Sequence, residues 1–87
     1  MIKVEVNNKI DKYNYVLVDD KSNKYKLNIE FLGTDIYESD ILYINETLLN
    51  ENNFYTFGKI RNNNVESNDI LKIITNGKEI LLERYYG

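Results

Sequence analysis

The side chains that could support catalysis are few in this 87-residue chain, which contains no His and no Cys. It therefore lacks the usual acid or base for neutral pH, and it has no thiolate for a nucleophile, a metal site or a disulfide. The carboxylates that stand close together are Asp19 and Asp20, Asp35 and Glu38, and Glu46 and Glu51. Turn chemistry and solubility explain these pairs more simply than acid–base catalysis does. The sequence therefore predicts a protein that is not an enzyme.

Ligand-binding loops are also not indicated. Asp19, Asn23 and Glu30 match the first, fifth and twelfth positions of a calcium loop. However, Lys21 takes the third ligand position and Lys24 replaces the glycine that such a loop needs for its turn. The four glycines are isolated, so no phosphate-binding loop is formed. We expect neither a metal nor a cofactor.

Aromatic residues beside basic ones are the candidate binding residues. They are Phe54, Tyr55, Phe57, Lys59, Arg61, Arg84, Tyr85 and Tyr86. Exposed Tyr next to Arg is typical of protein recognition, because Tyr provides a large amphipathic area. The same mixture could stack the bases of a single-stranded nucleic acid. About half of these side chains would point into the core by strand alternation.

The net charge of −3 decides between these two classes of partner. A chain with a pI near 4.9 has no overall positive field to attract phosphates. We therefore expect a small binding module that recognises a protein or peptide. The alternative is a single-stranded nucleic-acid-binding domain of the OB type.

Length and composition predict one small domain over residues 1–87. Ala is absent while Ile and Tyr are abundant, which favours strands over helices. The first residues have no apolar leader core, and no apolar run approaches the length of a membrane span. A cytoplasmic protein without disulfides is expected.

The clearest structural signal lies between Tyr13 and Phe31. Apolar and polar residues alternate strictly from Lys24 to Phe31, as in a strand with one buried face. The Asp- and Asn-rich segment 19–23 favours a turn, so an antiparallel hairpin is predicted. Its odd-numbered apolar residues, Leu17 and Leu27 among them, would form one buried layer.

The segment 32–53 supports two interpretations. Residues 40–45 have the composition of a short strand, followed by one helical turn near 46–50. Alternatively, Tyr37, Ile41, Ile44 and Leu48 have helical spacing. We favour the strand, and we expect further strands at residues 2–6 and from residue 54 to Gly58, where the chain could bend.

A second hairpin is predicted around Asn76-Gly77, the preferred pair for a type I′ turn. This register places Ile73 opposite Ile80, and Asp69 opposite Arg84 as an ion pair. A helix over residues 69–75 is the alternative, and residues 61–68 are expected to form an exposed loop.

These elements together predict a mainly all-β fold: a small curled antiparallel sheet or a partly open barrel, OB-like or SH3-like. The two end segments, residues 1–6 and 85–86, could offer sheet edges. The chain would then be a monomer or an edge-paired homodimer.

Overall fold

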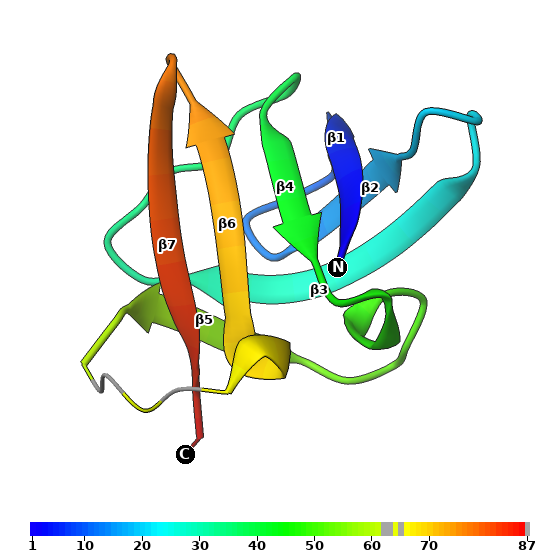
Figure 1. Cartoon of the computed structure of the whole chain (residues 1–87). Helices are drawn as coiled ribbons and strands as arrows, with labels where there is room; N and C mark the ends of the chain where they lie inside the picture. The colour runs from blue at the N-terminus through cyan, green and yellow to red at the C-terminus, as the bar shows by residue number, and fades with distance from the viewer. Residues whose placement is uncertain (62–63, 65, 87) are drawn as a thin grey trace.

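The computed structural model describes residues 1–61, 64 and 66–86, without the side chain of residue 67. Its strands are β1 (Ile2–Lys9), β2 (Asn14–Val18), β3 (Lys24–Phe31), β4 (Ile41–Ile44), β5 (Tyr55–Lys59), β6 (Ile70–Thr75) and β7 (Lys78–Tyr85). Two 3-10 turns, η1 (Glu46–Leu48) and η2 (Ser67–Asp69), interrupt them (Figure 1). The predicted all-β class is confirmed. None of the described helical segments has the length and apolarity to span a bilayer.

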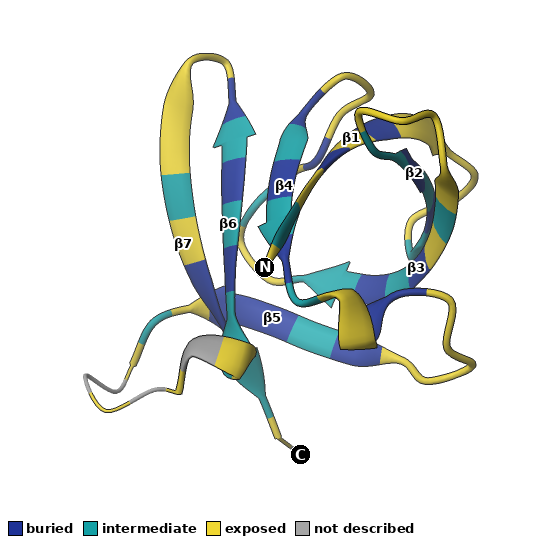
Figure 2. Ribbon diagram, turned by 45° about the vertical axis from the view of Figure 1, so that its right-hand side comes forward, coloured by how far each residue is buried: buried dark blue, intermediate teal, exposed yellow. Residues whose placement is uncertain are grey.

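The seven strands form one sheet that closes on itself as a ring, in the order β1-β2-β3-β5-β7-β6-β4 and back to β1 (Figures 1 and 2). The pairs are antiparallel except β3 with β5, which is parallel. The sheet is therefore mixed: the curled antiparallel sheet that was expected contains one parallel junction. Closure leaves few free edges.

The hairpin between residues 13 and 31 is confirmed. Tyr15 pairs with Leu27 and Leu17 pairs with Tyr25, so odd residues face odd residues. Leu17, Leu27 and Ile29 are buried. The hydrophobic pattern sets this register because a one-residue slip would expose the whole apolar layer.

The β6–β7 hairpin is also confirmed, and the helical alternative for residues 69–75 is wrong. Asn76 and Gly77 have φ of 50° and 74°, as a type I′ turn requires. Ile73 pairs with Ile80 as expected. The expected ion pair of Asp69 with Arg84 does not form: Asp69 lies in η2 and accepts a hydrogen bond from Tyr86 instead.

In the segment 32–53 the strand prediction is confirmed and the long helix is wrong. β4 covers residues 41–44, and η1 is the helical turn expected near 46–50. Asn45 caps η1, since its side chain accepts a hydrogen bond from the Thr47 amide. No helix forms between the third and fourth strands, in contrast to the arrangement that suggested the OB-like comparison.

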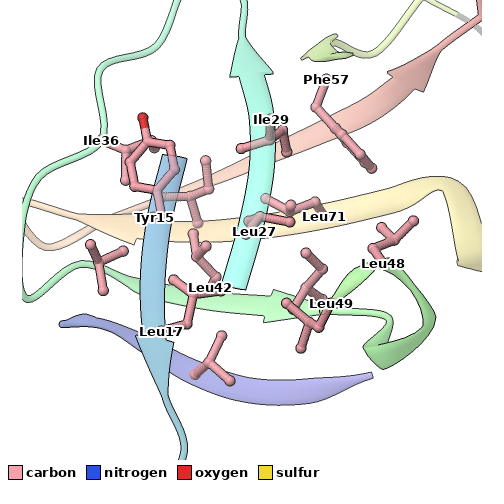
Figure 3. Close-up of a cluster of buried hydrophobic side chains, with 14 of the residues drawn as sticks. Tyr15, Leu17, Leu27, Ile29, Ile36, Leu42, Leu48, Leu49, Phe57 and Leu71 are labelled. Atoms are coloured by element: carbon pink, nitrogen blue, oxygen red, sulfur yellow. The ribbon is translucent and has the colours of Figure 1, made fainter. Parts of the chain in front are cut away.

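The core fills the inside of the ring (Figure 3). Every strand contributes to it by alternation, for example Phe57, Leu71 and Ile73, which are fully buried. Leu48 and Leu49 at η1 and Ile36 in the β3–β4 connection are buried in the same cluster. Two irregular segments thus complete the core that the strands enclose.

Candidate functional site

The predicted binding residues divide into core and surface groups. Tyr55 and Phe57 point into the ring and are buried, with relative exposures of 5% and 0%. Phe54, just before β5, is exposed and packs edge-on against Tyr13, with 5.5 Å between the ring centroids. The remaining five residues lie on the β5–β7 pair or just beyond it. Lys59 is opposite Leu82, Arg84 is opposite Phe57 and Tyr85 is opposite Thr56, while Arg61 and Tyr86 follow the ends of the two strands.

The first part of the surface group is built on Tyr85, which lies on the outer face of β7 and pairs with Thr56. Its hydroxyl donates a hydrogen bond to the carbonyl oxygen of Lys59 at 2.7 Å. The guanidinium carbon of Arg61 lies 3.5 Å from the centroid of the Tyr85 ring. The aromatic ring of Tyr85 thus holds Arg61, whose side chain remains 62% exposed.

Glu83 orients the same arginine. Arg61 Nε lies 3.5 Å from Glu83 Oε1, and the Glu83 side chain is only 6% exposed. Glu83 is opposite Gly58 in the β5–β7 ladder, and the Tyr85 ring lies against that glycine. Arg61 therefore offsets part of the cost of burying a carboxylate.

The second part is built on Arg84, whose side chain lies on the other face of β7. Its guanidinium carbon is 4.6 Å from the centroid of the Tyr55 ring and 4.5 Å from that of Tyr86. The Tyr86 hydroxyl donates a hydrogen bond to Asp69 Oδ1 at 2.7 Å, which raises the pKa of Tyr86. We call Arg61, Arg84, Tyr55, Tyr85 and Tyr86 the Arg–Tyr cluster.

The Tyr55 side chain is also held by a residue outside the closed sheet. Its hydroxyl donates a hydrogen bond of 2.6 Å to Glu51 Oε2. Burial, with this hydrogen bond as the second cause, raises the pKa of Tyr55, while the same bond lowers the pKa of Glu51. The aromatic ring of Tyr55, on which Arg84 stacks, is thus held in one position.

A surface hollow of about 670 Å³ lies beside the cluster. It is lined by Arg61, Asn64, Glu66, Asp69, Glu83, Arg84 and Tyr86. Two guanidinium groups and three carboxylates therefore share one site, where they balance one another instead of forming a cationic patch. Among the described residues, no three carboxylates come together as a metal site.

Sequence reasoning found the arginines and tyrosines and paired Asp69 with Arg84. It missed the hydrogen bonds from Tyr55 to Glu51 and from Tyr86 to Asp69, and the ion pair of Arg61 with Glu83. The β6–β7 register places Glu83 on the outer face, where a carboxylate is normally exposed. Gly58 does signal a close approach, as a glycine in a strand often does, but the group that approaches it is the ring of Tyr85.

The ring and its balanced Arg–Tyr cluster define a small all-β protein with a polar, aromatic surface hollow. Comparison with protein-family models, curated proteins and solved structures finds no match to this chain.

Proposed function

We propose that this protein is a non-catalytic binding module that recognises a protein or peptide through the Arg–Tyr cluster. The observation that carries the proposal is the exposed guanidinium of Arg61, which is held on the ring of Tyr85 beside the hollow. A stacked arginine loses less conformational freedom when it binds than a free one does. Arg and Tyr also dominate the energetics of protein interfaces.

The charges of the hollow support a polypeptide over a nucleic acid. Glu66, Asp69 and Glu83 line it together with the two arginines. A phosphate backbone brought to this site would meet those carboxylates, and the net charge of −3 would add no attraction. A polypeptide can instead offer donors to the carboxylates and acceptors to Arg61.

A single-stranded nucleic-acid-binding domain of the OB type is the second candidate. Its support is Tyr86, which is 67% exposed next to Arg84 and could stack on a base. Tyr55 and Phe57, however, are in the core and cannot take part. The stacking surface is therefore smaller than the sequence suggests.

The test begins with selection from a phage-displayed library of random dodecapeptides against the immobilised protein. We expect enriched peptides whose affinity falls about tenfold in Arg61→Ala and in Tyr86→Ala, the reduction typical of an interface hot spot. Lys78→Ala, at the exposed β6–β7 turn, is the matched control and should bind as the wild type does.

Fluorescence anisotropy with labelled dT15 and rU15 oligonucleotides, over a salt series, tests the second candidate. Oligonucleotide binding that weakens steeply with salt, with no enriched peptide, would reject the protein-recognition proposal in favour of nucleic acid. Enriched peptides that bind equally well to both variants would reject the Arg–Tyr cluster as the binding surface.

A further inference from the structure

Strand β1 is paired on both sides over only part of its length. Towards β4 it is paired from Ile2 to Glu5. Towards β2 the pairing begins only at Glu5, which is opposite Val18, the last residue of β2. The β2–β3 turn then carries the chain away from β1, as Figure 1 shows at the right of the molecule. Residues 2–4 therefore have no strand on that side in the described part of the chain.

The direction of the backbone groups identifies which residue is left unpaired. Val6 donates its amide hydrogen to the Asp40 carbonyl and accepts from the Ser39 amide, so Val6 faces the β4 side. Successive residues of a strand direct their N–H and C=O groups to alternate sides, so Val4 also faces β4. Lys3 faces the other side, where β2 has ended, and its N–H and C=O are available to a further strand.

A groove of about 700 Å³ lies along this unpaired stretch. Its apolar lining residues are the half-buried Ile2, Val18, Tyr25 and Ile41 and the buried Val4. Ile2 and Tyr25 also pack against the core, so the groove has a fixed apolar floor. We call this site the β1 groove.

The opposite wall of the β1 groove is the β2–β3 turn, which is held by Asp19. Asp19 Oδ1 accepts hydrogen bonds from the Lys21 and Asn23 amides at 2.9 and 2.8 Å. Its second oxygen accepts a hydrogen bond from the Tyr25 hydroxyl at 2.9 Å. The turn is thus built by its own contacts and does not close onto β1.

We infer that the β1 groove binds an extended segment of a partner protein, which adds a strand to β1 opposite Lys3. The inference rests on the proposed function, since its occupant is a polypeptide, and it adds a second surface to the Arg–Tyr cluster. Main-chain hydrogen bonds to the free groups of Lys3 would provide affinity, and side-chain alternation would provide specificity.

The surroundings of Lys3 specify the chemistry of that segment. The residue opposite Lys3 would lie on the outer face beside its exposed ammonium group, which forms no ion pair with a described residue. The charged residues that line the β1 groove are Lys3, Lys21, Glu5, Asp19 and Asp20, and Asp19 is already hydrogen-bonded within its own turn. An acidic residue of the segment therefore fits only directly opposite Lys3. Its two neighbours would point the other way, towards Ile2 and Tyr25, so they should be apolar. A second copy of the chain fits less well, because a twofold pairing centred on residue 3 would oppose two Lys3 side chains.

Hydrogen exchange measured by NMR on the free protein tests the unpaired edge itself. The Lys3 amide should exchange at least about tenfold faster than the Val4 amide, which is bonded within the β1–β4 ladder. Equal protection of these two amides would overturn the inference before any ligand is added.

The same dodecapeptide library then tests the occupant. We expect a group of peptides with an acidic residue between two apolar ones, which slow the exchange of the Lys3 amide when bound. Lys3→Glu should weaken them about tenfold and select peptides with a basic residue instead, as expected for a charge reversal in a strand pair. Lys3→Pro should abolish binding because it removes the donor.

Lys3→Pro should still fold, since the β1–β4 ladder does not use the Lys3 amide and a proline is tolerated at a sheet edge. The NMR spectra of Lys3→Pro and Lys3→Glu verify that both variants are folded. The two proposals fail separately. If every enriched peptide requires Arg61 and none requires Lys3, the β1 groove is rejected and the proposed function stands. If no peptide is enriched, both are rejected.

Discussion

Gly58 provides the sharpest test of how the Arg–Tyr cluster is built. A Cβ atom at this position would lie 2.8 Å from Tyr85 Cζ and 2.9 Å from its hydroxyl oxygen. Real Cβ atoms do not approach other atoms so closely, so Gly58→Ala must displace the ring. The ring is the end of a side chain and can move, but only by giving up its interactions with Lys59 and Arg61.

The energetic cost of that displacement is the sum of these two interactions. The hydrogen bond from Tyr85 to the Lys59 carbonyl contributes about 1 kcal/mol, and the stacked Arg61 contributes about 0.5–1 kcal/mol. Alanine is favoured over glycine in a strand by about 0.5–1 kcal/mol, which offsets part of the cost. We therefore expect Gly58→Ala to lower the free energy of unfolding by about 1 kcal/mol.

A double-mutant cycle measured by urea denaturation isolates this effect. In a Tyr85→Ala background the obstacle is gone, and Gly58→Ala should then stabilise the protein by about 0.5–1 kcal/mol. The coupling between the two positions should be about 1.5–2 kcal/mol. If Gly58→Ala has the same effect in both backgrounds, Tyr85 does not lie against Gly58 and the described arrangement of the cluster is refuted.

Three further predictions concern the irregular parts of the ring. Asn50, with φ of 60°, donates its amide hydrogen to Lys26 O at 2.9 Å and accepts the Lys26 amide on its side chain at 2.7 Å. Asn50→Gly should therefore lower the free energy of unfolding, measured by urea denaturation, by about 1 kcal/mol, because the side-chain hydrogen bond is lost. Asn50→Ala should lower it by about 2 kcal/mol, because alanine adds the strain of a positive φ. Equal losses in the two variants would contradict this strain. The buried Thr75 hydroxyl has no hydrogen-bond partner among the described residues, so Thr75→Val should raise the free energy of unfolding by about 1 kcal/mol, and a decrease would contradict this. Hydrogen bonds, chiefly from the Asn23 side chain, lower the pKa of Asp19 to about 2. The charged form of Asp19 thus contributes stability that is present above about pH 4 and is lost as the pH falls towards 2. Asp19→Asn should flatten this part of the dependence of unfolding free energy on pH. An unchanged pH dependence in this variant would count against the role of Asp19.

The two hairpins could be predicted from the sequence because their signals are local. Between residues 24 and 31, alternation and an adjacent polar turn specify both the strand and its register. Asn76-Gly77 does the same for β6 and β7, because few other pairs adopt two positive φ values easily. In both cases the information lies within about twenty residues of chain.

The parallel pairing of β3 with β5 could not be predicted in this way. Ile29 pairs with Tyr55 across a long connection, and no turn motif signals such a contact. Ile36 was missed for a related reason: it is one apolar residue in a polar segment, and only the closed ring makes it part of the core. Both the β3–β5 pairing and the burial of Ile36 depend on contacts between segments that are far apart in the sequence.

The candidate site was predicted in its residue types and not in its geometry. Alternation puts Arg84 and Tyr85 on opposite faces of β7, so one arginine stacks on Tyr55 and Tyr86 while Arg61 stacks on Tyr85. Glu83 is buried on the outer face opposite Gly58, and the Tyr85 ring lies over that glycine. These relations depend on the β5–β7 register, which the sequence does not reveal.

The contacts of Arg61 with β7 connect the stability of the protein to binding at the Arg–Tyr cluster. Arg61 lies beyond β5 and reaches back to Tyr85 and Glu83 on β7, so its position depends on the β5–β7 pairing. A ligand that holds Arg61 would therefore also hold the end of this strand pair and stabilise the ring by mass action. Lys3 lies on β1, which is not a neighbour of β5 or β7 in the ring, so occupation of the β1 groove should leave the Tyr85 contacts unchanged. The two surfaces should therefore bind independently, and their contributions to the affinity of a bivalent partner should combine through effective concentration.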